Sequence, residues 1–209
     1  MTAERPIDVA AWRRQTRAAL LDARRAMPLG AHRAASVAIM RGLTACLPPT
    51  AGVTTGCYWP VKREPDCLPY MREVLREGGR VALPVVVGRG MPLEFRLWTE
   101  DAKMEAGAWG IPHPADGPPV VPDALVVPLV GFDEVGYRLG YGAGYYDVTL
   151  ASLSPRPLAV GVGFEFSRLV TIHPQAHDMA MDVIVTELGN QVFHQPSSGD
   201  PAQSGRRVP

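Results

Sequence analysis

A glycine-rich segment between a predicted strand and a predicted helix constrains the fold of this chain more than any other feature. Residues 124–128 read Ala-Leu-Val-Val-Pro, an apolar run that predicts a strand covered on both faces of a sheet. Residues 143–153 predict a helix, and the glycines lie in between. This succession is typical of α/β proteins, in which ligands bind beyond the carboxyl ends of the strands.

Strands and helices alternate along the rest of the chain. The predicted fold class is α/β: a single-domain layered fold with a largely parallel sheet flanked by helices, and a helical N-terminal portion. We expect this domain to span residues 1–194 and residues 195–209, rich in Ser, Gly, Pro and Arg, to form a disordered tail. The further predicted helices cover 7–27, 31–46 and 67–77, and the further strands cover 53–58, 80–87, 93–98, 158–162 and 183–185.

The first predicted helix should turn an apolar stripe toward the core. The stripe consists of Trp12, Ala19, Ala23 and Ala26. Arg13 and Arg17 lie one turn apart on a neighbouring face. The other arginines of this helix are assigned to solvent, as is usual on a surface helix: Arg14, Arg24 and Arg25.

Composition limits the partners and the location. The 209 residues include 21 Lys+Arg and 21 Asp+Glu, so the net charge gives no argument for binding nucleic acid or an anionic membrane. No apolar run approaches the roughly 18 residues of a membrane span, and the N-terminus lacks the apolar core of a signal peptide. Cys46, Cys57 and Cys67 form no CxxC pair and are expected to be free thiols. We therefore expect a cytoplasmic protein with no nucleic-acid and no membrane partner.

The glycine-rich segment has the elements of a phosphate-binding loop. Gly140, Gly142 and Gly144 let backbone N–H groups approach a ligand without side-chain obstruction. The following helix offers free N–H groups and the positive end of its dipole, and Arg138 offers a guanidinium suited to phosphate oxygens. The spacing matches neither GxGxxG nor GxxxxGK[ST]. On these residues alone, a tight structural turn with packed tyrosines is an equal alternative.

The run Arg-Leu-Gly-Tyr-Gly-Ala-Gly-Tyr-Tyr-Asp at 138–147, after Pro-Leu-Val-Gly-Phe-Asp at 128–133, resembles the signature of the 5-formyltetrahydrofolate cyclo-ligase family. Further resemblances follow in order from about residue 11 to residue 187. They are the basic pair Arg13 and Arg17, the segments 59–64 and 109–114, and the stretch that contains Asp178 and Asp182.

The resemblance implies that ATP and Mg²⁺ are the cofactors. It assigns catalytic roles to Arg138 and Asp147, and metal contacts to Asp147 and Asp182. On the residues alone, both aspartates are better explained as capping or solvated carboxylates. The implied nucleotide contacts are Arg13, Arg17, Arg138, Leu139, Gly140, Tyr141, Gly142, Ala143, Gly144, Tyr145 and Tyr146.

The implied folate contacts are Trp59, Glu64, Trp109 and Tyr145. A carboxylate at Glu64 would accept hydrogen bonds from the pterin N–H groups, although a surface ion pair is the simpler explanation. Trp59 and Trp109 are more often core residues, but each lies in a Pro-containing loop and would stack on a flat ring.

The implied reaction is the ATP- and magnesium-dependent cyclisation of 5-formyltetrahydrofolate to 5,10-methenyltetrahydrofolate, with release of ADP and phosphate. We expect a monomer that binds these two small-molecule substrates. Ala143 stands where some family members carry Lys, and Val148 where members often carry Arg, so Arg13, Arg17 and Arg138 would have to supply more of the positive charge. A non-catalytic folate- or nucleotide-binding protein and a sugar-phosphate isomerase or transferase are the alternatives on the same scaffold.

Overall fold

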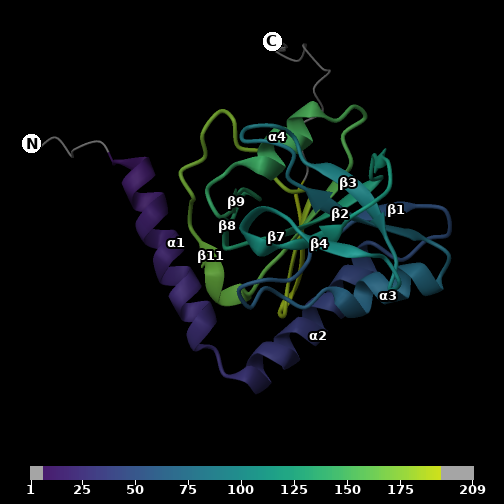
Figure 1. Ribbon diagram of the computed structural model, residues 1–209. Coiled ribbons are helices and arrows are strands. Elements are labelled where there is room, and N and C mark those ends of the chain that lie inside the picture. The colour runs from purple at the N-terminus through teal and green to yellow at the C-terminus, as the bar shows by residue number, and fades with distance from the viewer. Residues whose placement is uncertain (1–6, 194–209) are drawn as a thin grey trace, which may run out of the picture.

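The computed structural model describes residues 7–193 and is built around an eight-stranded sheet (Figure 1). In spatial order the strands are β13 (Gly189–Val192), β12 (Val183–Thr186), β10 (Leu158–Val162), β7 (Ala124–Pro128), β1 (Thr54–Gly56), β2 (Arg80–Val85), β3 (Glu94–Trp98) and β6 (Pro119–Val120). The strands from β12 to β2 run parallel, whereas β13, β3 and β6 pair antiparallel at the two edges. The predicted α/β fold with a largely parallel sheet is confirmed.

Helices cover both faces of this sheet. α2 (Leu29–Cys46) and α3 (Leu68–Arg76) lie on one face, and α4 (Tyr145–Ser152) lies on the other (Figure 1). Strand β7 serves both layers, because Val126 packs in the cluster that contains Ile39 of α2, whereas Leu125 and Val127 pack in the cluster that contains Leu150 of α4. Burial of each such side chain contributes about 1.5–3 kcal/mol. The expectation that residues 124–128 form a strand covered on both faces is therefore confirmed.

Two small sheets contain strands that the sequence did not predict. β8 (Gly131–Asp133) lies between β9 (Arg138–Leu139) and β11 (Arg168–Leu169), and β4 (Met104–Ala106) pairs with β5 (Pro112–Pro114). Short 3₁₀ helices are found at η1 (Ala108–Gly110) and η2 (Glu165–Ser167). The β8–β9 hairpin, which the sequence did not predict, lies between β7 and the glycine-rich loop. Strands of two or three residues are too short to display a two-residue period.

Helix α1 (Val9–Ala26) packs beside β8 and β9, on the side of the molecule away from α3 (Figure 1). Leu20 fits against Gly131, where an added Cβ would lie 2.7 Å from its Cδ1 atom. The predicted apolar stripe is wrong, because its alanines are exposed: Ala19, Ala23 and Ala26. Arg24, assigned to solvent, is instead only 1% exposed. Alanines bury little apolar area, so the hydrogen bonds of the arginines decide which face turns inward.

The prediction about the cysteines is tested by the structure, whereas the prediction about the C-terminal end is not. Cys46, Cys57 and Cys67 are free, as expected. Among the described helices, none is both long and apolar enough to cross a membrane. The predicted domain end at residue 194 and the predicted tail at 195–209 lie outside the described residues.

Candidate functional site

The glycine-rich loop, residues 140–144, connects β9 to α4 at one end of the parallel strands. The backbone just before the hairpin is tied to that end, because Leu129 N donates to Val162 O, the last residue of β10, at 3.0 Å. Gly142 has φ 101° and Gly144 has φ 70°, in the left-handed region that favours glycine. Gly144 caps α4, whose first-turn N–H groups lack partners within the helix. The loop therefore lies at the carboxyl ends of the strands, where α/β proteins bind ligands.

Arg17 reaches into this loop from α1. Its Nε donates to Gly140 O at 2.7 Å, and a Cβ added to Gly142 would lie 3.3 Å from its Cζ atom. Within residues 7–193 its terminal nitrogens make no hydrogen bond. Burial, and next the charge of Arg13, lower the pKa of Arg17. A half-buried guanidinium with free donors beside backbone N–H groups is suited to hold an anion.

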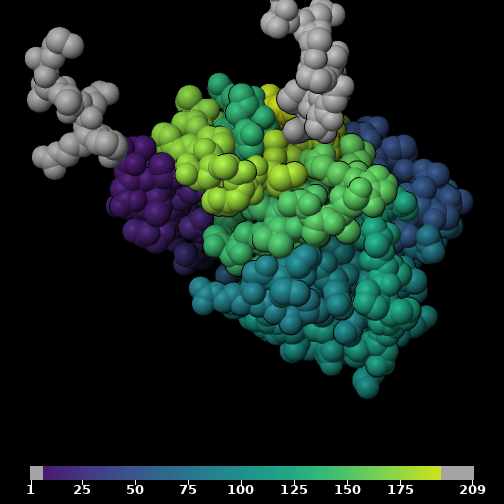
Figure 2. Space-filling model, turned by 90° about the horizontal axis from the view of Figure 1, so that it is seen from above, coloured from purple at the N-terminus to yellow at the C-terminus, as the bar shows by residue number. Residues whose placement is uncertain are grey.

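Arg13 has a different environment, although it is only one turn away. Its guanidinium pairs with Asp178 at 2.5 Å and donates to Ile172 O and His173 O. Figure 2 shows this end of α1 against the 165–180 region of the chain. The donors of Arg13 are thus used within the protein, so its geometry favours the attachment of α1 over the phosphate contact that the resemblance implies.

Arg138 and Asp147 form a largely buried ion pair. Arg138 Nη2 lies 3.0 Å from Asp147 Oδ2, and the two side chains are 4% and 15% exposed. Both also bind Met179, since Arg138 donates to its carbonyl oxygen at 3.1 Å and Asp147 accepts from its N–H at 2.9 Å. The positive charge of Arg138 is therefore neutralised by Asp147, and Arg138 is placed to hold this carboxylate as much as a phosphate.

Asp182 lies at the other end of the sheet. It directly precedes β12, and its carboxylate accepts from Ala159 N in β10 at 2.7 Å and pairs with Arg156 at 2.7 Å. The structure gives Asp147 and Asp182 different arginine partners and does not bring them together. No group of three or more His, Cys, Asp or Glu side chains that could hold a metal occurs among the residues described. This geometry favours a structural role for Asp182 over the metal contact that the resemblance implies.

Glu64 lies against the glycine-rich loop and is only 3% exposed. Its carboxylate accepts from Tyr141 Oη at 2.8 Å and from Val61 N at 2.9 Å. Tyr141 Oη in turn accepts from Arg24 Nη1 at 3.3 Å, and Lys62 Nζ lies 4.8 Å from the centre of the Tyr141 ring. Burial raises the pKa of Glu64. The surface ion pair considered for Glu64 is excluded, and this carboxylate belongs to the same site as the loop.

The predicted aromatic contacts divide into two groups. Trp109 is 70% exposed, so its ring is available to a flat ligand, and its ring centre lies 5.9 Å from that of Tyr145, which is half-buried against the core cluster that contains Leu150. Trp59 packs instead against the main core, 6.4 Å from Trp98 between ring centres. Burial raises the pKa of Tyr146, whose ring centre lies 5.8 Å from the Arg138 guanidinium. Trp59 and Tyr146 therefore pack against the core and remain partly exposed.

Two further predicted nucleotide contacts, Leu139 and Ala143, differ in exposure. Leu139 is buried in β9, whereas Ala143 is exposed in the loop. Arg24 is the residue that sequence reasoning missed. Its spacing of seven from Arg17 was the available signal, because residues seven apart lie on one helix face.

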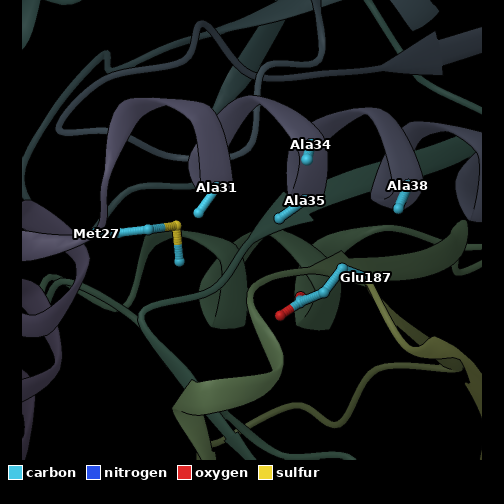
Figure 3. A pocket seen from close by; sticks show the side chains of 6 residues that line it. All are labelled: Met27, Ala31, Ala34, Ala35, Ala38 and Glu187. Atoms are coloured by element: carbon cyan, nitrogen blue, oxygen red, sulfur yellow. The ribbon is translucent and has the colours of Figure 1, made fainter.

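Two surface hollows lie elsewhere, around α2. One of about 420 Å³ separates α2 from Glu187 (Figure 3). Its other lining residues are Met27, Ala31, Ala34, Ala35 and Ala38. The second, of about 780 Å³, lies between α2 and α3. None of the predicted site residues lines either hollow, so neither belongs to the site around the glycine-rich loop.

The sheet and the loop define the chain as an α/β protein with a glycine-rich loop at the carboxyl ends of its parallel strands. The family model described as "5-formyltetrahydrofolate cyclo-ligase family" matches residues 9–187. The 5-formyltetrahydrofolate cyclo-ligase of Mycolicibacterium smegmatis is 32% identical over 183 residues, which cover 82% of this chain and 92% of the relative. The chain therefore belongs to the 5-formyltetrahydrofolate cyclo-ligase family, as the sequence resemblance implied.

Solved structures agree with this assignment. The structure of 5,10-methenyltetrahydrofolate synthetase from Aquifex aeolicus is 31% identical, with a TM-score of 0.75, and the match covers 90% of this chain and 96% of that one. The synthetase from Mycoplasma pneumoniae is 24% identical with a TM-score of 0.69, covering 87% of this chain and 99% of that one, and shares the fold.

Proposed function

We propose that this chain catalyses the ATP- and magnesium-dependent cyclisation of 5-formyltetrahydrofolate to 5,10-methenyltetrahydrofolate, releasing ADP and phosphate. The observation that carries the proposal is the hydrogen bond between Glu64 and Tyr141, which joins the expected folate carboxylate to the expected phosphate loop. Family membership and the names of the relatives support the same reaction.

The reaction requires activation of the formyl group, because its oxygen is a poor leaving group. Transfer of the γ-phosphoryl group of ATP to this oxygen releases ADP and gives a phosphorylated iminium. N10 then attacks the activated carbon, the C–O bond breaks, phosphate leaves and N10 loses its proton. Phosphoryl transfer depends on positioning and charge neutralisation and needs no protein nucleophile.

Arg17 and the loop glycines are the groups best placed to bind the phosphates. Arg17 has free terminal donors in the part of the chain that the structure describes, and glycines at 140, 142 and 144 leave the backbone N–H groups open. Arg13 and Arg138 would contribute indirectly, because Arg13 is paired with Asp178 and Arg138 is paired with Asp147. With Ala143 in the loop, Arg17 provides the charge that a lysine would add.

Asp147 fits a magnesium contact as a single carboxylate. Its Oδ1 accepts a hydrogen bond from Met179 N and its Oδ2 is paired with Arg138, so each oxygen keeps acceptor capacity for a ligand. Magnesium is usually held by one or two carboxylates together with substrate phosphates and water. When bound, the ion would neutralise phosphate charge, and Asp147, oriented by Arg138 and Met179 N, would fix its place.

Glu64, Trp109 and Tyr145 would bind the folate. Glu64 keeps acceptor capacity on both oxygens for the N–H groups of the pterin. The exposed ring of Trp109 and the neighbouring, half-buried ring of Tyr145 would pack on a flat ring of the substrate.

The test is the absorbance of the methenyl product. Protein mixed with 5-formyltetrahydrofolate and MgATP should generate the methenyl chromophore, and omission of ATP should abolish it. Arg17→Ala should raise the KM for ATP roughly ten-fold or more, whereas Arg14→Ala, at an exposed position on the same helix, should not. Folate binding without ATP turnover would instead support a non-catalytic binding protein.

A further inference from the structure

Arg24, Tyr141 and Glu64 form a chain of hydrogen bonds that crosses the site. Tyr141 Oη is the middle member, 3.3 Å from Arg24 Nη1 and 2.8 Å from Glu64 Oε1. Arg24 can only donate, so the hydroxyl accepts from Arg24 and its own proton points to Glu64. The direction of both hydrogen bonds is thus fixed by chemistry.

Arg24 is a buried charge that depends on this chain. Among residues 7–193 it makes no direct salt bridge, and its other hydrogen bond goes to the carbonyl oxygen of Leu129. A buried charge without compensation is costly, so Glu64, linked through one hydroxyl, is its counter-ion. The titratable and charged groups that influence Glu64 are Tyr58, Lys62, Cys67, Tyr141, Tyr146 and Arg24.

Helix α1 holds the loop at two adjacent residues. Arg17 binds Gly140 O, and Arg24, seven residues later on the same face, binds Tyr141 Oη. Segment 61–64 is attached to the end of the same helix, since Arg63 donates to Met27 O at 2.5 Å and to Arg25 O at 2.7 Å. Glu64 and the loop are therefore positioned by one common support.

We propose that Arg24 and Tyr141 are positioning residues that couple the glycine-rich loop to Glu64, so that folate and nucleotide bind cooperatively. The inference rests on the proposed function. A folate that binds ionised Glu64 holds its carboxylate in place. This carboxylate accepts the Tyr141 hydrogen bond, which in turn holds the loop in position for phosphates. The ligand that binds first thereby reduces the ordering cost for the second, and by linkage the effect is reciprocal.

Equilibrium binding tests this coupling without turnover. 5-formyltetrahydrofolate is titrated by calorimetry in the presence of Mg²⁺, with and without the β,γ-imido analogue of ATP. In the wild type, the analogue should tighten folate binding about five-fold or more. Tyr141→Phe removes one oxygen, and should weaken folate binding about ten-fold and abolish the effect of the analogue. The matched control is Tyr137→Phe, because the Tyr137 hydroxyl has no hydrogen-bond partner in the described part of the chain.

Arg24→Lys provides an independent variant, with Arg25→Lys at an exposed neighbouring position as its control. It keeps the charge but replaces the two guanidinium nitrogens that bind Tyr141 Oη and Leu129 O with a single nitrogen, so the coupling should fall while both ligands still bind. Folate binding should also weaken at a higher pH in Tyr141→Phe than in the wild type as the solution is acidified, because the Tyr141 hydroxyl lowers the pKa of Glu64.

If the wild type binds both ligands and forms product but the coupling is equal in wild type, Tyr141→Phe and Arg24→Lys, the inference is wrong and the proposed function stands. If the wild type forms no product, the proposed function is wrong.

Discussion

At the scale of single residues, Asp147 and Asp182 differ in what their oxygens already bind. Asp147 is paired with Arg138 beside the loop, whereas Asp182 binds Arg156 and the backbone at the amino ends of β10 and β12. Asp147→Asn should therefore raise the magnesium concentration for half-maximal activity roughly ten-fold. A magnesium titration of the product-forming reaction measures this change.

Asp182→Asn is the matched comparison, since it makes the same chemical change in another ion pair. It should leave the magnesium titration unchanged and lower the free energy of unfolding by about 1–3 kcal/mol, because Arg156 and Ala159 N lose a charged acceptor. A shifted magnesium titration in Asp182→Asn with normal stability would restore the metal contact that the resemblance implies.

Gly142 is the loop position at which a side chain is least tolerated. Its φ of 101° is strained for any residue with a Cβ, and that Cβ would meet the Arg17 guanidinium at 3.3 Å. Gly142→Ala should lower the free energy of unfolding by about 1–2 kcal/mol, as measured by urea denaturation. Gly140→Ala is the control for stability, because a Cβ there meets nothing within 4 Å. Equal losses in the two variants would contradict this explanation.

Residue types at the site could be predicted from the sequence, but their partners could not. The sequence grouped Arg13 with Arg17 because they lie one turn apart on a helix. Only the tertiary structure shows that Asp178 occupies the first and leaves the terminal donors of the second open. Arg24 was missed for the same reason, since nothing near it in the sequence marks Leu129 O and Tyr141 Oη as its acceptors.

At the scale of elements, α1 is held by polar contacts more than by apolar burial. Most of its alanines face solvent, and Arg13, Arg17 and Arg24 bind carbonyl and carboxylate oxygens of three loops. The Arg13–Asp178 pair fastens the first half of the helix, with side-chain exposures of 16% and 8%. We therefore expect the stability of this attachment to depend on pH.

Arg13→Gln should lower the free energy of unfolding by about 2 kcal/mol near neutral pH. Burial opposes ionisation of Asp178, but the hydrogen bond and charge of Arg13, the hydrogen bond from Gln175 N and the charge of His177 together outweigh it, so the pKa of Asp178 lies below its ordinary value. The stabilisation is therefore complete above the unfolded pKa of about 3.9 and is lost as pH falls through the lower folded pKa. Urea unfolding from neutral pH to about pH 3 should show the difference between wild type and variant shrinking with acidity. A constant difference would exclude Asp178 as the cause.

The helices and the apolar strands of the main sheet were predictable, whereas the short strands of the two small sheets were not. Strands β7 and β10 have the expected bounds, since each is a continuous apolar run, and α2 ends before Pro48 as expected. The β8–β9 hairpin is absent from the prediction because its strands have only three and two residues. Strands this short display no two-residue period, so the sequence did not show that a hairpin precedes the loop.

At the scale of the whole molecule, the site is assembled from segments that are far apart in the chain. Arg17 and Arg24 come from α1, Glu64 follows β1, Trp109 lies in η1, and the loop precedes α4. Helix α1 contributes two arginines to the proposed site and packs beside β8 and β9, the strands of a small separate sheet (Figure 1). Ligand binding should therefore affect the attachment of α1 more than the sheet and α2.

Hydrogen exchange of the complete protein tests this expectation. Saturation with Mg²⁺ and the β,γ-imido analogue of ATP, at about 100 times its Kd, should stabilise the folded state by about 2.7 kcal/mol. Protection should rise in α1 around Arg17 and in residues 140–144, because the phosphates would bind the free donors of Arg17 and fix it against Gly140 O. Helix α2, which carries none of the proposed ligand contacts, should show no added protection against local opening. Arg17→Ala should remove the effect in α1, whereas an unchanged effect in this variant would show that the nucleotide binds away from α1.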